Sequence, residues 1–283
     1  MNINICNHDC TELWDQVLYK KLSHYPDISD WEMKNILDFI TYEKKHNREV
    51  EILSDQDIIV QKVKKASKEM ERFATAIRPE KITECTACPI RKGCMTKFVC
   101  HTSPLENAIK IFESGKLLSA VNARKLPDYV LAAEPRNAAH DPEDFFHYVM
   151  FTWGNCQAGD RLVMERKLKR NPTEEDMGAN LTPGVRFYFE YDNLNNHPAA
   201  VHDGFLPIKV KDEVELAKYV YAIIIPMEYK NQIKDYIPKE LLSRTYYVEN
   251  DCKDVWEWSE KVYSYIENLY KKEEKLQNKK MKT

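Results

Sequence analysis

The feature that most constrains this chain is a group of four cysteines within sixteen positions. Cys85, Cys88, Cys94 and Cys100 follow the spacing C-x2-C-x5-C-x5-C. Two thiolates at C-x2-C spacing can hold one ion, and four thiolates satisfy either tetrahedral zinc or an iron–sulfur cluster. The spacing does not decide between Zn²⁺ and a [4Fe–4S] cluster. We therefore predict a metal centre of one of these two kinds in residues 81–100.

Composition sets the class of protein and its expected compartment. The 283 residues are 43% hydrophobic, with a net charge of only −3, which predicts a globular chain without an overall attraction to polyanions. We expect no membrane partner, because no apolar run approaches the length of a membrane span. The N-terminus has no signal-peptide pattern, so we expect a cytoplasmic protein whose thiols are reduced. A weaker group, Cys6, His8 and Cys10, could donate a further metal ligand.

The first eighty residues predict a helical lobe. Ser29 and Glu32 form a capping box ahead of one apolar stripe, and a second helix start follows at Ser54. Apolar residues then continue at helical spacing to Phe73, and Pro79 marks a stop. We assign residues 1–80 to this lobe.

After the cysteines the pattern changes to alternating strands and helices. Strands are expected at 98–101, 148–153, 186–191 and 218–225, where β-branched and aromatic residues concentrate. A helix should follow Pro104 and end at Gly115, and a last helix should run from Asp254 to about Lys272. The prediction is an α+β domain over residues 101–272, followed by a basic, frayed tail at 273–283.

The first strand carries a motif with a family resemblance. His101-Thr102-Ser103 ends the strand, a helix follows, and the helix leads into Ser114-Gly-Lys-Leu-Leu118. This order resembles the first motif of ADP-ribosyltransferases, above all the DarT-like and RNA 2′-phosphotransferase-like branches. The resemblance covers roughly residues 98–237 and implies a split β-sheet core. It also implies that His101 hydrogen-bonds the ribose of NAD.

Two further elements of the resemblance lie downstream. The family has a strand whose tyrosine stacks on nicotinamide, and here Met150 occupies that place, so Tyr148, Phe151 or Trp153 would have to supply the ring. The family also places a glutamate at the mouth of a later strand. For this role we predict Glu215, with Glu213 as the second choice.

The chemistry of NAD cleavage gives these residue types a reason. A carboxylate stabilises the oxocarbenium-like transition state, and an aromatic face favours the cationic nicotinamide ring. The planar donors of Arg124 suit pyrophosphate. The catalytic residues expected are His101, Glu215 and Glu213. The expected NAD-binding residues are Thr102, Ser103, Arg124, Tyr148, Phe151, Thr152 and Trp153.

The resemblance implies transfer of ADP-ribose from NAD to an unidentified macromolecule, such as a nucleic acid, in a toxin or phage-defence setting. Two alternatives stay open. One is a metal-stabilised module that binds a nucleotide or nucleic acid without chemistry. The other is an RNA 2′-phosphotransferase, which would need basic residues around the pocket; the available arginines are Arg124, Arg136, Arg161, Arg166 and Arg186.

Overall fold

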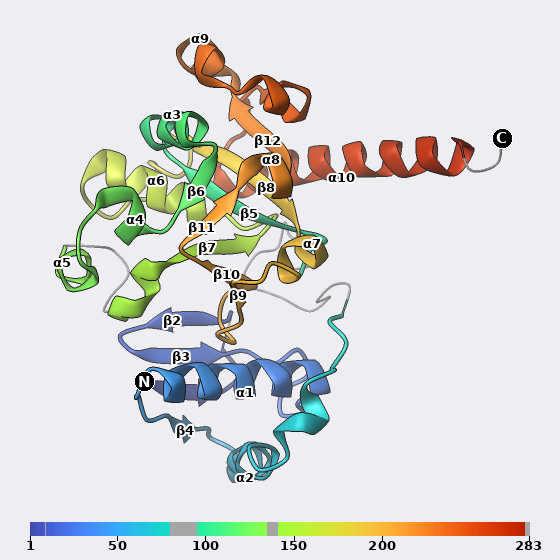
Figure 1. The fold of residues 1–283 in the computed structure, drawn as a ribbon. Coiled ribbons are helices and arrows are strands. Elements are labelled where there is room, and N and C mark those ends of the chain that lie inside the picture. Colours follow the sequence, from blue (N-terminus) through green and yellow to red (C-terminus); the bar gives the residue numbers. More distant parts are fainter. Residues whose placement is uncertain (9, 80–94, 135–140, 281–283) are drawn as a thin grey trace.

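The structure is a computed structural model that describes residues 1–8, 10–79, 95–134 and 141–280. It is a mixed α and β protein with two lobes (Figure 1). Among the described residues, no helix combines the length and the apolar character needed to cross a membrane.

The N-terminal lobe is a small sheet covered by helices. Its strands, in the order β2-β3-β1-β4, are β1 (Asn2–Ile5), β2 (Glu12–Trp14), β3 (Val17–Lys20) and β4 (Glu51–Leu53). Its helices are α1 (Asp30–Lys45), α2 (Asp57–Ala66) and the 3₁₀ turn η1 (Met70–Phe73). The lobe therefore mixes strands and helices, which corrects the expectation of a purely helical lobe.

Local sequence explains these N-terminal elements. The capping box at Ser29 is confirmed, since its hydroxyl accepts from the Glu32 amide and the Glu32 carboxylate accepts from the Ser29 amide. The β2–β3 hairpin turns through Asp15 and Gln16, both with positive φ as a type I′ turn requires. The second helix begins at Asp57 and ends at Ala66, so the expected single helix to Phe73 is broken.

The second lobe is built on a seven-stranded sheet with the order β13-β12-β8-β5-β7-β10-β9. Among the strands described in this sheet, only β12 and β13 pair in parallel. The strands are β5 (Phe98–Ser103), β7 (Tyr148–Trp153), β8 (Val185–Glu190), β9 (Ala200–Val201), β10 (Ile208–Lys211), β12 (Val220–Pro226) and β13 (Thr245–Val248). A separate two-stranded ribbon pairs β6 (Lys116–Leu118) with β11 (Glu213–Glu215).

Helices surround this sheet. They are α3 (Leu105–Ser114), α4 (Ala120–Arg124), α5 (Asp128–Ala132), α6 (Ala158–Leu168), α7 (Tyr191–Asn195), α8 (Leu216–Tyr219), α9 (Lys230–Ile233) and α10 (Val255–Lys280). The 3₁₀ turns are η2 (Glu143–His147), η3 (Met227–Tyr229), η4 (Lys234–Tyr236) and η5 (Lys239–Arg244). Helix α3 ends at Gly115 with φ 68°, as predicted for a left-handed C-cap.

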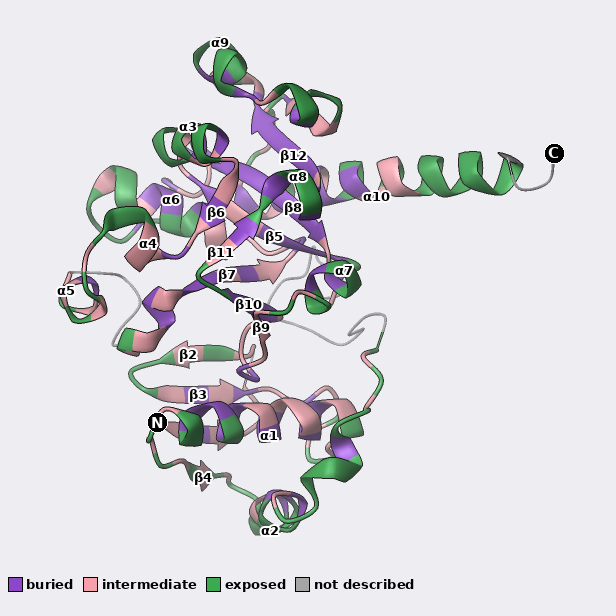
Figure 2. Cartoon of the chain, viewed as in Figure 1, coloured by how far each residue is buried: buried purple, intermediate pink, exposed green. Residues whose placement is uncertain are grey.

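The central strands are buried on both faces (Figure 2). The C-terminal half of α10 is exposed and projects from the body (Figures 1 and 2). On one face, Val99 and Phe151 join a core with α3 and the β6–β11 ribbon. On the other face, Phe98 and Cys100 pack with Trp258 of α10. Residues 273–280 continue α10, so the expected frayed tail is helical up to that point.

A loop and a buried lysine join the two lobes. The loop between β9 and β10 reaches α1 (Figure 1), and its Gly204 comes so close that an added Cβ would lie 2.0 Å from the Asn35 carbonyl oxygen. Lys209 is fully buried, with Nζ 3.0 Å from Asp203 Oδ2 and 3.8 Å from the ring centroid of Tyr42. Desolvation lowers the pKa of this lysine, although the Asp203 carboxylate opposes the shift.

Candidate functional site

The central sheet splits beside His101. Strand β5 pairs with β8 along its whole length, from Phe98 to Ser103, but pairs with β7 only at Val99 and Cys100. Beyond Cys100 the edge between β5 and β7 opens, and the His101 side chain bridges it. Its Nδ1 lies 3.1 Å from the carbonyl oxygen of Met150 on β7. The ring therefore replaces a ladder hydrogen bond at the point where the strands part.

The two hydrogen bonds of His101 define its tautomer. A carbonyl oxygen can only accept, so Nδ1 carries the proton and donates to Met150. Nε2 is then an acceptor, and Ser103 Oγ at 3.1 Å donates to it. Burial lowers the pKa of His101 to about 4, so the ring is neutral at pH 7. The residue as a whole keeps partial exposure, and its Nε2 is a neutral acceptor of fixed orientation that the buried Ser103 hydroxyl occupies.

Thr102 lies on the opposite face of β5 from His101 and Ser103. Side chains alternate along a strand, so Thr102 shares its face with Cys100, whose Sγ is 3.8 Å from Thr102 Oγ1. Gly159 of α6 packs so tightly there that a Cβ would meet Thr102 Oγ1 at 2.4 Å. The structure thus brings Ser103, but not Thr102, onto the face of His101.

The aromatic candidates on β7 differ in their surroundings. Tyr148 is buried against Tyr42 at the lobe junction, and Phe151 is completely buried, edge-on to the His101 ring. Trp153 keeps partial exposure and lies tilted on Tyr191. Its neighbour Thr152 donates a 3.4 Å hydrogen bond to the Cys100 carbonyl oxygen. Of the three rings, Trp153 is the most exposed, and the Arg78 guanidinium lies over it, with Cζ 5.6 Å from the ring centroid.

The β6–β11 ribbon covers the His101 face of the sheet and carries both predicted glutamates on its outer side. Val214 is buried in the same core as Val99 and Phe151, so its neighbours Glu213 and Glu215 point to the opposite side of the ribbon. Lys116 Nζ lies 2.6 Å from Glu213 Oε1, and the carboxylate raises the pKa of this lysine. Glu215, exposed and directly across the ribbon from Lys116, is the less restrained of the two carboxylates.

Two predicted arginines are already engaged. Arg124 makes a bidentate surface pair with Glu134, with distances of 2.5 and 2.6 Å, so binding pyrophosphate would require Glu134 to be released. Arg186 is fully buried, paired with Asp160 and donating to Ser259 Oγ at 2.6 Å. Arg186 therefore fixes β8 to α6 and α10 and has no access to a ligand. Sequence reasoning missed this buried pair, because its partners lie 26 and 73 residues away.

Of the predicted metal ligands, Cys85, Cys88 and Cys94 lie outside the described residues. Cys100 is buried in the apolar core beneath α10, and burial raises the pKa of its thiol to about 12. A zinc or cluster ligand is a thiolate, and a bound ion would itself lower this pKa, so the value does not decide whether Cys100 is the fourth ligand. The metal centre stays a prediction for all four cysteines.

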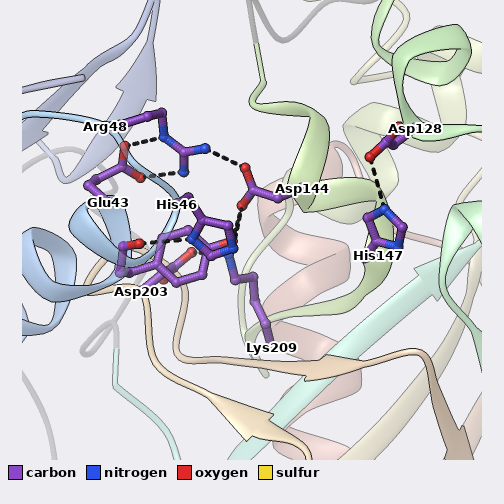
Figure 3. Close-up of polar contacts among 9 residues, drawn as sticks. Glu43, His46, Arg48, Asp128, Asp144, His147, Asp203 and Lys209 are labelled. Atoms are coloured by element: carbon purple, nitrogen blue, oxygen red, sulfur yellow. Dashed lines mark hydrogen bonds and ion pairs between the residues drawn. The ribbon is translucent and has the colours of Figure 1, made fainter.

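A pocket of about 520 Å³ at the lobe junction was not predicted from the sequence. It is lined by Met1, Gln16, His46, Arg48, Asp128, Ala132, Asp141, Pro142, Glu143 and Asp144. Figure 3 shows Arg48 between Glu43 and Asp144, and Asp128 paired with His147 at 3.0 Å. Four of the ten lining residues are carboxylates and Arg48 is held by Glu43 and Asp144, which disfavours a pyrophosphate, so we do not place NAD there. No sequence signal links these segments, which lie about 100 residues apart.

Comparisons with protein-family models, with curated proteins and with solved structures find no match for this chain.

Proposed function

We propose that the α+β lobe binds NAD at the split between β5 and β7 and transfers its ADP-ribose to a macromolecular acceptor. The observation that carries the proposal is the state of His101. It is a neutral imidazole of fixed tautomer at a break in the sheet, on the face covered by the ribbon that holds Glu213 and Glu215.

Each group has a role in this proposal that follows from its chemistry. His101 Nε2 accepts from a ribose hydroxyl, and the Ser103 hydroxyl, displaced from Nε2, turns to a second polar atom of the nucleotide. The Glu215 carboxylate stabilises positive charge that develops on the ribose as the bond to nicotinamide breaks. Trp153 offers an aromatic face to the cationic nicotinamide ring before cleavage.

The surroundings of the arginines favour ADP-ribosyl transfer over the 2′-phosphotransferase alternative. The latter reaction must hold an RNA phosphate as well as the NAD pyrophosphate. Arg186 is buried, which removes one of the five arginines considered for this task. Arg124 is held in an exposed pair with Glu134, and Arg136 lies outside the described residues. The alternative of a non-catalytic binding module predicts NAD binding without turnover. An activity assay therefore distinguishes it from the proposal.

NAD binding to the full chain tests the site. Calorimetric titration should detect binding by the wild type, and His101→Gln should weaken it at least about tenfold, or about 1.4 kcal/mol. His202→Gln is the matched control, since His202 lies in the loop between β9 and β10, where its Nε2 lies 2.8 Å from the Asn195 side-chain oxygen. Equal NAD affinity in the wild type and in folded His101→Gln would remove His101 from the site.

A further inference from the structure

The loop between β1 and β2 brings a histidine, a cysteine and a carboxylate together at the surface of the N-terminal lobe. One ligand atom each from His8, Cys10 and Glu12 can be chosen so that all three lie within 4.8 Å of one another. This group is separate from residues 85–94 in the sequence, and it plays no part in the NAD site proposed above.

The hydrogen bond of His8 Nδ1 leaves the other ring nitrogen, Nε2, as the possible metal ligand. Nδ1 lies 3.1 Å from the carbonyl oxygen of Cys10, which can only accept, so the proton resides on Nδ1. Nε2 then carries a free lone pair directed away from that bond. A backbone carbonyl that fixes the tautomer in this way is the usual outer partner of a metal-binding histidine. The ring is also stacked on Tyr19 of β3, with centroids 5.2 Å apart.

The separation between His8 and Glu12 is also compatible with a shared metal ion. Nε2 lies 3.6 Å from Glu12 Oε1. In the neutral ring both atoms are acceptors, so a cation between them would satisfy both, whereas a ring protonated on both nitrogens would pair with Glu12 directly. Two ligands at 2.0–2.1 Å from a tetrahedral zinc are about 3.4 Å apart, close to the separation observed.

We propose that His8 Nε2, Cys10 Sγ and Glu12 Oε1 form a mononuclear Zn²⁺ site, with water in the fourth position. Nitrogen, thiolate and carboxylate donors at these separations suit zinc, whereas calcium and magnesium prefer oxygen donors alone. The ion would tie the end of β1 to the start of β2. All three side chains keep some exposure, so an ion can enter from solvent.

The difference in zinc content between variants tests this site. Full-length protein is loaded with Zn²⁺, dialysed, and its zinc measured by elemental mass spectrometry. The wild type should hold one equivalent more than His8→Ala or Cys10→Ser, whatever residues 85–94 contribute, since that contribution is common to all variants. With Co²⁺ in place of zinc, Cys10→Ser should lose intensity in the thiolate-to-metal charge-transfer band.

Cys6→Ser is the matched control, because Cys6 lies in the same loop but outside the three-residue group. It should retain the wild-type zinc content. Equal zinc in the wild type and in His8→Ala would overturn the proposal, and so would loss of the equivalent in Cys6→Ser. His8→Ala carries the test alone if Cys10→Ser does not fold, and circular dichroism checks the fold of each variant.

Discussion

Replacing Arg48 should destabilise the protein far more than replacing a similar arginine on the surface. Arg48 donates to both carboxylate oxygens of Glu43, at 2.6 and 2.9 Å, and to Asp144 Oδ1 at 2.5 Å. The Glu43 side chain is only 1% exposed. Arg48→Met therefore leaves the buried Glu43 carboxylate without its cationic partner, a change that commonly costs about 3–5 kcal/mol. Because Arg48 itself is 26% exposed and water can enter, we expect about 2–4 kcal/mol.

Arg124→Met supplies the matched control. The Arg124–Glu134 pair is also bidentate, but its side chains are 48% and 39% exposed, so its loss should cost about 0–1 kcal/mol. The assay is urea unfolding at pH 7, followed by tryptophan fluorescence and circular dichroism. The double variant Arg48→Met/Glu43→Gln should recover much of the loss, since no buried charge remains unpaired. Equal destabilisation by Arg48→Met and Arg124→Met would refute this reasoning.

Three further outcomes are expected. Gly204→Ala should lower stability by about 2–4 kcal/mol in urea unfolding, because φ is 72° and the new Cβ would overlap the Asn35 carbonyl oxygen. His101→Gln should flatten the pH dependence of stability. The pKa of this histidine falls from 6.5 to about 4 on folding. The contribution of the neutral ring to the free energy of unfolding is therefore complete above pH 6.5. It is lost as the pH falls towards 4, by up to about 1.4 kcal/mol per pH unit. In nicotinamide-release assays, Glu215→Gln should reduce turnover about 10²–10³-fold with little change in NAD affinity, and Glu213→Gln should have the smaller effect; the reverse order would exchange the two roles.

Local signals predicted several elements because the forces that set them are local. The capping box at Ser29 started α1 where expected, and Gly115 ended α3 in the left-handed conformation. Strand β7 has the predicted bounds, Tyr148–Trp153, because its aromatic and β-branched residues fill both faces of a buried strand.

The N-terminal strands were missed although one of them left a signal. Asn2–Ile5 alternates polar and apolar residues, and Ile3 and Ile5 are completely buried, as a period of two predicts for a half-covered strand. Strands β2 and β4 have only three residues each, too few for periodicity to separate them from loops. Their pairing depends on the β2–β3 turn and on the crossover through α1.

The candidate site was predicted in part, since residue order does not reveal the face of a strand or its distant partners. His101 and Ser103 share one face, while Thr102 packs on the other against Gly159. The Lys116–Glu213 pair joins residues 97 apart, which no local pattern shows. The contacts of Arg48 across the lobe junction escaped prediction for the same reason.

Transfer of label from NAD tests the central proposal most directly. The full-length protein is incubated with NAD labelled in its adenylate phosphate, with and without a cell extract divided into protein and nucleic-acid fractions. The proposal predicts release of nicotinamide and covalent label in one fraction, with both signals lost in His101→Ala and retained in His202→Gln. Binding of NAD without nicotinamide release or covalent label, across all fractions, would contradict it and leave a non-catalytic nucleotide-binding protein.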